Sequence, residues 1–179
     1  MNGSSTLPAG TAMRTALIDA ALRILHRDGA AALTVRSITA EAGCSTTGVY
    51  TYFGGKLGLV EAIYVEGFES FDRALDPLLE RGDIAGSGLA YRHWALEHPT
   101  QYMVMFGRAV PEFEPSDEAR SRGLVSFAKL AEAIARGVPT HSARGEKACK
   151  VGIEGNDFGL WIGEQGDCTQ NSYRAAHVE

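Results

Sequence analysis

Hydrophobic positions recur at helical spacing through most of the first 140 residues. A first helix is predicted over residues 12–28 from one apolar stripe, made by Leu17, Ala20, Ala21, Ile24 and Leu25. Gly29 follows directly, at the position where a glycine in the left-handed conformation caps a helix. The preceding residues are small and polar, with Pro8 and Gly10, so residues 1–11 are expected to form a flexible arm.

Two short helices are predicted next, joined by a tight turn. The first begins after a capping residue, Thr34, and ends before Gly43; the second begins after Ser45 and ends before Gly54-Gly55. Each has an apolar face, made by Val35, Ile38 and Ala42 in the first and by Val49 and Phe53 in the second. Two short helices joined by a short glycine-containing turn are typical of a helix-turn-helix motif, here 34–53.

A longer helix is predicted from Lys56, and Pro77 is expected to stop or kink it. Its apolar side is made by Val60, Ile63, Tyr64, Gly67, Phe68, Phe71 and Leu75. Further helices are predicted over 89–97 and from Pro99, followed by a loop over 108–115. Ser116 can cap the last one, which ends near Gly137 and has the apolar stripe Leu124, Phe127, Ala128, Ala131, Ile134 and Ala135.

These elements predict an all-α fold with two domains. Residues 12–70 form a three-helix helix-turn-helix domain, which the long helix joins to a second helical domain over 71–140. Beyond residue 140 the pattern fails, because residues 141–179 contain six glycines, scattered charge and no sustained period. This segment is expected to be an atypical tail, either disordered or the product of truncation or an altered reading frame.

Composition narrows the class of protein. Hydrophobic residues make up 45% of the chain and charged residues 22%, which excludes collagen-like, disordered and disulfide-framework proteins. No apolar run approaches the roughly 18 residues of a membrane helix, and no secretory signal is expected at the N-terminus. Three cysteines without metal-binding spacing (Cys44, Cys149 and Cys168) favour a reduced, cytoplasmic setting with no metal or cofactor.

Charge is unevenly distributed along the chain. The formal net charge is −5, yet residues 1–58 carry a net +2 and the remainder a net −7. This asymmetry weakly favours an N-terminal surface that faces an anion.

The second short helix has a face suited to DNA. Val49 and Phe53 lie on its inward side, whereas Thr47 and Thr51 lie about 160° around the helix from Val49, at 100° per residue. With Gly48 on the flank, the outward surface consists of hydroxyls, methyls and bare backbone, which can approach base edges in the major groove. Gly48 is explained either by close approach to DNA or by a short helix that tolerates glycine.

Other residues lie where DNA contacts are expected. Thr34, Tyr50, Tyr52 and Lys56 lie at helix ends or turn edges, where side chains and helix N-termini hold phosphates. Arg36, in the first turn of its helix, is the cation placed to reach a base edge.

The segment from Leu33 to Leu59 resembles the DNA-binding domain of TetR-type (tetracycline-repressor-like) transcriptional regulators. The most specific residues are Thr34, Ile38-x-Ala40-x-x-Gly43 and Val49-Tyr50-x-Tyr52-Phe53-x-x-Lys56-x-x-Leu59. The resemblance implies phosphate contacts by Thr34, Tyr50, Tyr52 and Lys56, and base contacts by Arg36, Thr46, Thr47, Gly48 and Thr51. Tyr52 departs from the pattern, because the family often has histidine there, but a phenol can also bond to a phosphate.

The second domain resembles one branch of TetR regulatory domains over Tyr91-Arg92-x-Trp94-Ala95-x-Glu97-His98-Pro99 and onward to Gly107. The resemblance implies a small-molecule effector and a homodimer. That branch normally continues into two amphipathic helices that pair between subunits, and residues 141–179 do not resemble them. An apolar effector would contact an aromatic and methionine group that also fits an ordinary core: Phe68, Phe71, Tyr91, Trp94, Tyr102, Met103, Met105 and Phe106.

Enzyme signatures are absent from the sequence. There is no nucleophile elbow, zinc-binding His-Glu-x-x-His or phosphate-binding loop, and Gly86-Ser87-Gly88 precedes a helix without the strand that a dinucleotide site needs. His93 and His98 lie five apart, which does not suit a shared metal, and Cys44 is either a small half-buried residue or a redox-sensitive one. Four acids near the loop are expected to be solvated: Glu112, Glu114, Asp117 and Glu118.

The sequence thus predicts a DNA-binding regulator, a repressor that a small effector releases from an operator. Three alternatives remain open: a DNA-binding protein with a defective regulatory domain, a helical ligand-binding module without a DNA role, and a small helical enzyme.

Overall fold

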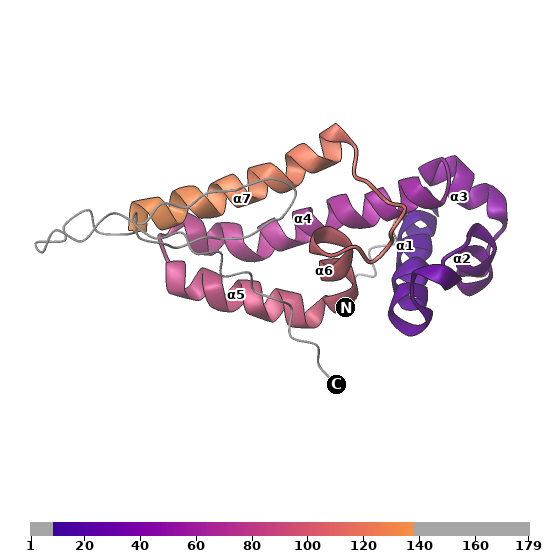
Figure 1. Ribbon diagram of the computed structural model, residues 1–179, viewed down its shortest axis with the longest axis horizontal. Coiled ribbons are helices and arrows are strands. Elements are labelled where there is room, and N and C mark those ends of the chain that lie inside the picture. The colour runs from indigo at the N-terminus through magenta and orange to yellow at the C-terminus, as the bar shows by residue number, and fades with distance from the viewer. Residues whose placement is uncertain (1–8, 138–179) are drawn as a thin grey trace, which may run out of the picture.

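The computed structural model describes residues 9–137, and these form a helical molecule with two lobes (Figure 1). The helices are α1 (Ala9–Asp28), α2 (Val35–Ala42), α3 (Thr46–Phe53), α4 (Lys56–Glu80), α5 (Ile84–Glu97), α6 (Pro99–Phe106) and α7 (Asp117–Gly137), with a 3-10 turn η1 at Ala30–Ala32. The described range contains no strand, so the predicted all-α fold is confirmed. Most of the predicted arm (1–8) and the whole predicted tail (141–179), with Cys149 and Cys168, lie outside the described residues.

Helices α1, α2 and α3 form the smaller lobe, at the right-hand end of Figure 1. Thr34 caps α2 as predicted: its hydroxyl accepts a bond from the Ser37 N–H at 3.1 Å, and the Ser37 hydroxyl accepts one from the Thr34 N–H at 2.9 Å. Gly43 ends α2 with a φ of 67°, a conformation that glycine adopts at low cost. Ser45 precedes α3 as predicted, but its side chain makes no capping hydrogen bond.

Helix α4 is the long connection between the lobes. It packs against α3 at its N-terminal end and against α5, α6 and α7 along the rest of its length (Figure 1). Of the two outcomes predicted for Pro77, the stop is wrong, because α4 continues to Glu80, and the kink stays a prediction. Pro77 lies on the exposed side, and burial of Leu75 and Leu79 offsets the lost backbone hydrogen bond.

Two helices begin earlier than predicted. Helix α1 begins at Ala9, inside the expected arm, and its first turn lies beside α3, since a Cβ at Gly10 would be 3.7 Å from the Tyr52 hydroxyl. Helix α5 begins at Ile84, since the Asp83 carboxylate caps it by accepting a bond from the Gly86 N–H at 2.8 Å. Gly86-Ser87-Gly88 therefore lies inside a helix rather than before one.

The buried face of α7 also differs from the prediction. Leu124 and Ala128 are exposed, whereas Gly123 and Ser126 are buried. A Cβ at Gly123 would lie 2.9 Å from the Phe68 ring, so small residues are needed where α7 meets α4. The predicted packing of the Ile134 and Ala135 side chains falls outside the described residues.

Candidate DNA-binding surface

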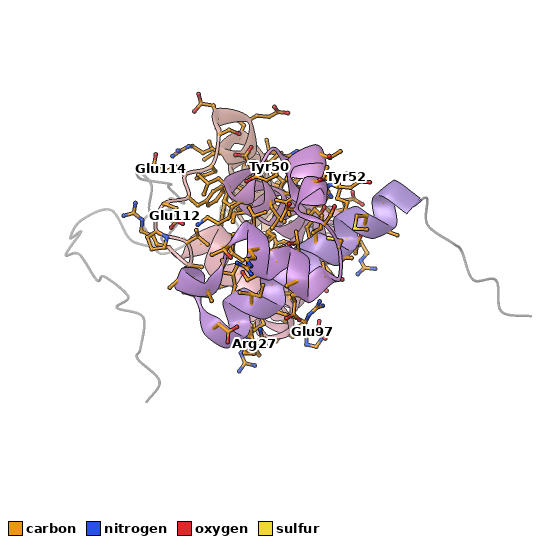
Figure 2. The ribbon with its side chains drawn as sticks, turned by 90° about the vertical axis from the view of Figure 1, so that its right-hand side faces the viewer. Arg27, Tyr50, Tyr52, Glu97, Glu112 and Glu114 are labelled. Carbon is orange, nitrogen blue, oxygen red and sulfur yellow. The ribbon has the colours of Figure 1, made fainter. Side chains whose placement is uncertain are left out.

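The predicted inward and outward sides of α3 are both confirmed by burial. Val49 is fully buried and Phe53 is half-buried, whereas Thr46, Thr47 and Thr51 are exposed. Two tyrosines project from the same helix: Tyr50 is 60% exposed and Tyr52 is 40% exposed. Figure 2 looks onto this end of the molecule and shows Tyr50 and Tyr52 near its upper edge. Helix α3 therefore presents hydroxyls, methyls and two phenols to solvent.

The Cβ direction at Gly48 separates the two explanations for this glycine. A Cβ built there would lie 3.6 Å from Leu17 Cδ1 and 3.9 Å from Cys44 Sγ. Both are ordinary van der Waals contacts, and both belong to the lobe itself. A side chain at position 48 would therefore start in contact with α1. This favours the second explanation, a short helix that tolerates glycine, over close approach to DNA.

Gly48→Ala is expected to stabilise the protein by about 0.5–1 kcal/mol, because alanine is the better helix former and the methyl fits the available space. The measurement is thermal unfolding, followed by operator affinity. If operator affinity is unchanged, Gly48 is not a base contact. A several-fold loss of affinity would instead support the predicted base contact at Gly48.

The other predicted contacts lie at the edges of this surface. Thr34 and Arg36 are exposed, one before α2 and the other in its first turn. The Arg36 guanidinium has no ion pair among the described residues. The Thr34 hydroxyl is engaged in the α2 cap, so a phosphate there would share it with the Ser37 N–H.

Lys56 is the exception, because a carboxylate from the other lobe already holds it. Its ammonium pairs with Glu112, which lies on the loop between α6 and α7. The hydrogen bond from Lys56 is the main cause of a lowered pKa of the Glu112 carboxyl, so Glu112 is ionised at neutral pH. Glu112 is exposed, as expected for a solvated acid, and it also forms this ion pair, which was not predicted. Sequence reasoning missed this contact, since the two residues are 56 positions apart.

Three further N-terminal cations are also paired. Arg14 pairs with Glu66, Arg23 with Glu41 at 2.9 Å, and Arg27 with Asp28 at 2.8 Å. The positive charge that the sequence assigns to residues 1–58 is thus largely matched by carboxylates in the structure. A phosphate at Lys56 would compete with Glu112 for the ammonium group.

The lobes also meet between α1 and the start of α6. His26 Nδ1 lies 3.2 Å from the Thr100 hydroxyl, beside an open groove of about 590 Å³ that Arg27, Glu97 and His98 help to line. Figure 2 shows Arg27 and Glu97 together at the lower edge of this view. The groove is wide open to solvent, so it marks a junction between the lobes rather than an enclosed site.

The residues predicted to line an effector pocket pack mainly against one another. The Phe71 ring centroid lies 5.4 Å from those of both Tyr91 and Trp94, and the Phe68 centroid lies 5.5 Å from that of Phe106. The Tyr91 and Tyr102 hydroxyls are 2.8 Å apart, and burial, with this hydrogen bond, raises the pKa of Tyr91. Met103 is half exposed. This packing is what a core provides, and the pocket stays a prediction.

Two parts of the chain match known protein families. Residues 17–63 match the family described as bacterial regulatory proteins, tetR family, and residues 84–154 match the tetracyclin repressor-like C-terminal domain. The chain belongs to the TetR family. The second match runs from α5 into the predicted tail, as far as residue 154, beyond the described range.

Individual relatives agree with this assignment. The HTH-type transcriptional regulator Rv1816 of Mycobacterium tuberculosis is 26% identical over 136 residues, which are 72% of this chain and 58% of that protein. The crystal structure of SCO4313, a candidate regulatory protein, superposes with a TM-score of 0.64 at 29% identity, covering 72% of this chain and 64% of that one. The TetR family regulator PfmR from Thermus thermophilus shares the fold, with a TM-score of 0.56 at 19% identity over 68% of this chain and 69% of its own.

This TetR-family chain spans just over half the length of the mycobacterial relatives that it matches. No helix within residues 9–137 is both long enough and apolar enough to cross a membrane. Within the same range, no cluster of histidine, cysteine or acidic side chains is suited to a metal ion.

Proposed function

We propose that this TetR-family protein is a transcriptional regulator that binds operator DNA in the cytoplasm, with α3 in the major groove. The observation that carries the proposal is the two-sided character of α3. Val49 is fully buried, so the helix is fixed to its lobe, while Thr46, Thr47 and Thr51 face outward. Threonine can hydrogen-bond to a base and can touch the thymine methyl group.

Phosphate contacts would orient α3 on the duplex. The exposed phenols of Tyr50 and Tyr52, the Thr34 end of α2 and the Lys56 end of α4 border the proposed base-reading surface. Arg36 would add a base contact from α2, because no carboxylate within residues 9–137 pairs with it. The net negative charge of the chain does not oppose this, since contact with DNA is local to one end.

The test is selection of DNA fragments by the full chain, followed by sequencing and measurement of affinity over a salt series. A palindromic consensus with salt-sensitive binding is expected, because phosphate contacts release counterions. Failure to enrich any sequence would overturn the proposal and would favour a helical ligand-binding module.

Thr47→Ala is expected to change which base is preferred at one position in each half-site, by about 1–3 kcal/mol for that base pair. Parallel selections with both proteins would measure it, and Lys56→Ala provides the comparison, since loss of a phosphate contact weakens all sequences alike. A uniform loss for Thr47→Ala would make Thr47 a backbone contact instead.

We further propose that the protein is a homodimeric repressor that a small, mainly apolar effector releases from DNA. Dimers of helix-turn-helix proteins place two recognition helices about 34–36 Å apart, in successive major grooves. Leu124 and Val125 are exposed on α7, which gives this face apolar area that a second subunit would cover. Sedimentation that shows a monomer at micromolar concentration would overturn the dimer and favour a defective regulatory domain.

Helix α4 supports a two-state mechanism for release. Its first residue, Lys56, belongs to the proposed phosphate surface, and its later turns pack against α5, α6 and α7. An effector that prefers one placement of these helices would change the spacing of the recognition helices and thus the affinity for DNA.

A further inference from the structure

Helix α3, the proposed recognition helix, is short and buries little of its own surface. It has eight residues, its N-cap Ser45 makes no capping hydrogen bond, and within this helix only Val49 is buried. Isolated helices shorter than about 12–15 residues are marginal in water, so the packing around α3 must fix its orientation. Contacts at the last turn of α3 therefore bear on how the helix is presented to DNA.

Arg14 of α1 makes such a contact. Its guanidinium carbon lies 5.3 Å from the centre of the Phe53 ring, within the range of a cation–π interaction. The centre of the Phe53 ring is 6.5 Å from that of Tyr52, in an edge-to-face arrangement. Helix α1 also approaches Tyr52 one turn earlier, at Gly10, where a Cβ would lie 3.7 Å from the Tyr52 hydroxyl. Two successive turns of α1 thus lie against the end of α3.

The same guanidinium joins this end of α3 to α4. Arg14 pairs with Glu66, which lies in the third turn of α4, and the two side chains are 41% and 34% exposed, so the pair is partly shielded from water. The next residue, Gly67, is where α6 packs so closely that a Cβ would overlap Met105 Sδ. Arg14 therefore connects the last turn of α3 to a part of α4 that the larger lobe holds in place.

These contacts distinguish Arg14 from a residue that holds phosphate. Its charge is matched by Glu66, and its guanidinium lies over a ring of α3. Tyr52, by contrast, is 40% exposed and is a predicted phosphate contact. A hydrogen bond weakens steeply once its angle falls below about 120°, so a small rotation of the last turn would take the Tyr52 phenol out of line with a phosphate oxygen.

We propose that Arg14 is a positioning residue for the recognition helix. Through Phe53 it holds the last turn of α3 in a fixed relation to α4, and this sets the position from which the Tyr52 hydroxyl meets a phosphate. Arg14 itself makes no contact with DNA. The effect on DNA affinity rests on the proposed function, whereas the effect on the stability of the last turn of α3 does not.

The first test is the operator affinity of Arg14→Gln, measured by fluorescence anisotropy over a salt series. A loss of about five- to tenfold is expected, because a cation–π contact and an ion pair are removed together. The slope of log affinity against log salt should equal that of the parent protein, since no cation is removed from a phosphate. A slope reduced by about 1 would make Arg14 a direct phosphate contact and would overturn the proposal.

Arg23→Gln is the matched control. Arg23 lies on the same helix and is also in an ion pair at the surface, but its partner, Glu41, belongs to α2. This variant removes the same charge and should keep operator affinity within about twofold of the parent value. Arg14→Lys should recover part of the loss seen with Arg14→Gln, because an ammonium group can also lie over an aromatic ring.

A double-mutant cycle tests whether Arg14 acts through Tyr52. Tyr52→Phe should weaken operator binding, and Arg14→Gln in that background should weaken it by at most about twofold more. Full additivity of the two losses would show that Arg14 does not act through Tyr52 and would contradict the proposal.

Hydrogen exchange without DNA separates this proposal from the proposed function. Amides in the last turn of α3 should exchange about fivefold faster in Arg14→Gln than in Arg23→Gln, because a contact that keeps this turn closed is lost. Equal exchange in the two variants would overturn the proposal even if operator binding fell, and faster exchange with unchanged operator affinity would also overturn it. Faster exchange in a protein that selects no DNA sequence would support Arg14 as the residue that positions α3 and would refute DNA regulation.

Discussion

Replacing Gly58 with alanine is expected to lower the melting temperature by roughly 10 °C and to abolish operator binding. Gly58 lies in the first turn of α4, where a Cβ would overlap the carbonyl oxygen of Phe53, the last residue of α3. The obstacle is backbone, which cannot rotate aside as a side chain can. Gly54 and Gly55, with φ of 70° and 140°, already bend the chain tightly here.

Helix α3 would have to move relative to α4, and the buried contacts of Val49 and Leu59 would loosen. Overpacking of this kind costs about 3 kcal/mol or more when backbone is involved. Thermal unfolding measures the loss, and a gel-shift assay below the new melting temperature tests whether α3 is still presented to DNA.

Gly88→Ala is the matched control for this prediction. Gly88 is an exposed residue inside α5, and a Cβ there meets no atom within 4 Å. Alanine should therefore stabilise the protein by about 0.5–1 kcal/mol, through helix propensity alone. If Gly58→Ala and Gly88→Ala gave the same change in melting temperature, the close approach of α4 to Phe53 would be refuted.

Opposite effects on DNA affinity are expected from the two members of the Lys56–Glu112 pair. Lys56→Ala should weaken operator binding about tenfold and reduce the slope of log affinity against log salt by about 1, because one phosphate contact is lost. Glu112→Gln should strengthen binding about threefold, since exposed ion pairs are weak and the freed ammonium becomes available to phosphate. Fluorescence anisotropy with labelled operator over a salt series measures both.

Glu114→Gln removes the same charge from the same loop, but no ion pair with Lys56 is present to be broken. It should change DNA affinity less than Glu112→Gln does. In the Lys56→Ala background, Glu112→Gln should have no more effect than Glu114→Gln. If Glu112 and Glu114 behaved alike in the parent protein, general repulsion of DNA by the loop would explain the result, and competition for Lys56 would be refuted.

The parts of this fold that depend on neighbouring residues were predictable from the sequence. The α2 cap at Thr34, the turn at Gly43 and the two sides of α3 each follow from residues a few positions apart. The start of α5 was missed, although Asp83 carries a capping signal, because the apolar stripe begins only at Leu89. Periodicity locates a buried face more reliably than it locates a helix end.

Contacts between segments that are far apart in the sequence could not be predicted from local spacing. The ion pair of Lys56 with Glu112 joins segments that are far apart along the chain, so no local spacing encodes it. Local spacing also does not show that the buried Tyr64 hydroxyl lacks a hydrogen-bond partner within residues 9–137. The buried face of α7 was misassigned because close helix packing at Gly123 selects small residues, whereas the pattern weights large ones. The role of Phe106 is ambiguous from the sequence. Aromatic residues recur at the same helical spacing whether they pack in a solid core or line a cavity.

The continuity of α4 has a consequence for how such proteins can be divided. One face of this helix buries Leu59 and Ile63 near the smaller lobe and Phe71 and Leu75 beneath α5–α7, without an interruption between them. A proteolytic fragment that stopped near residue 70 would carry uncovered hydrophobic surface and would be prone to aggregate. Recombination between relatives would therefore succeed best where both parents have the same α4, because both lobes pack against this helix.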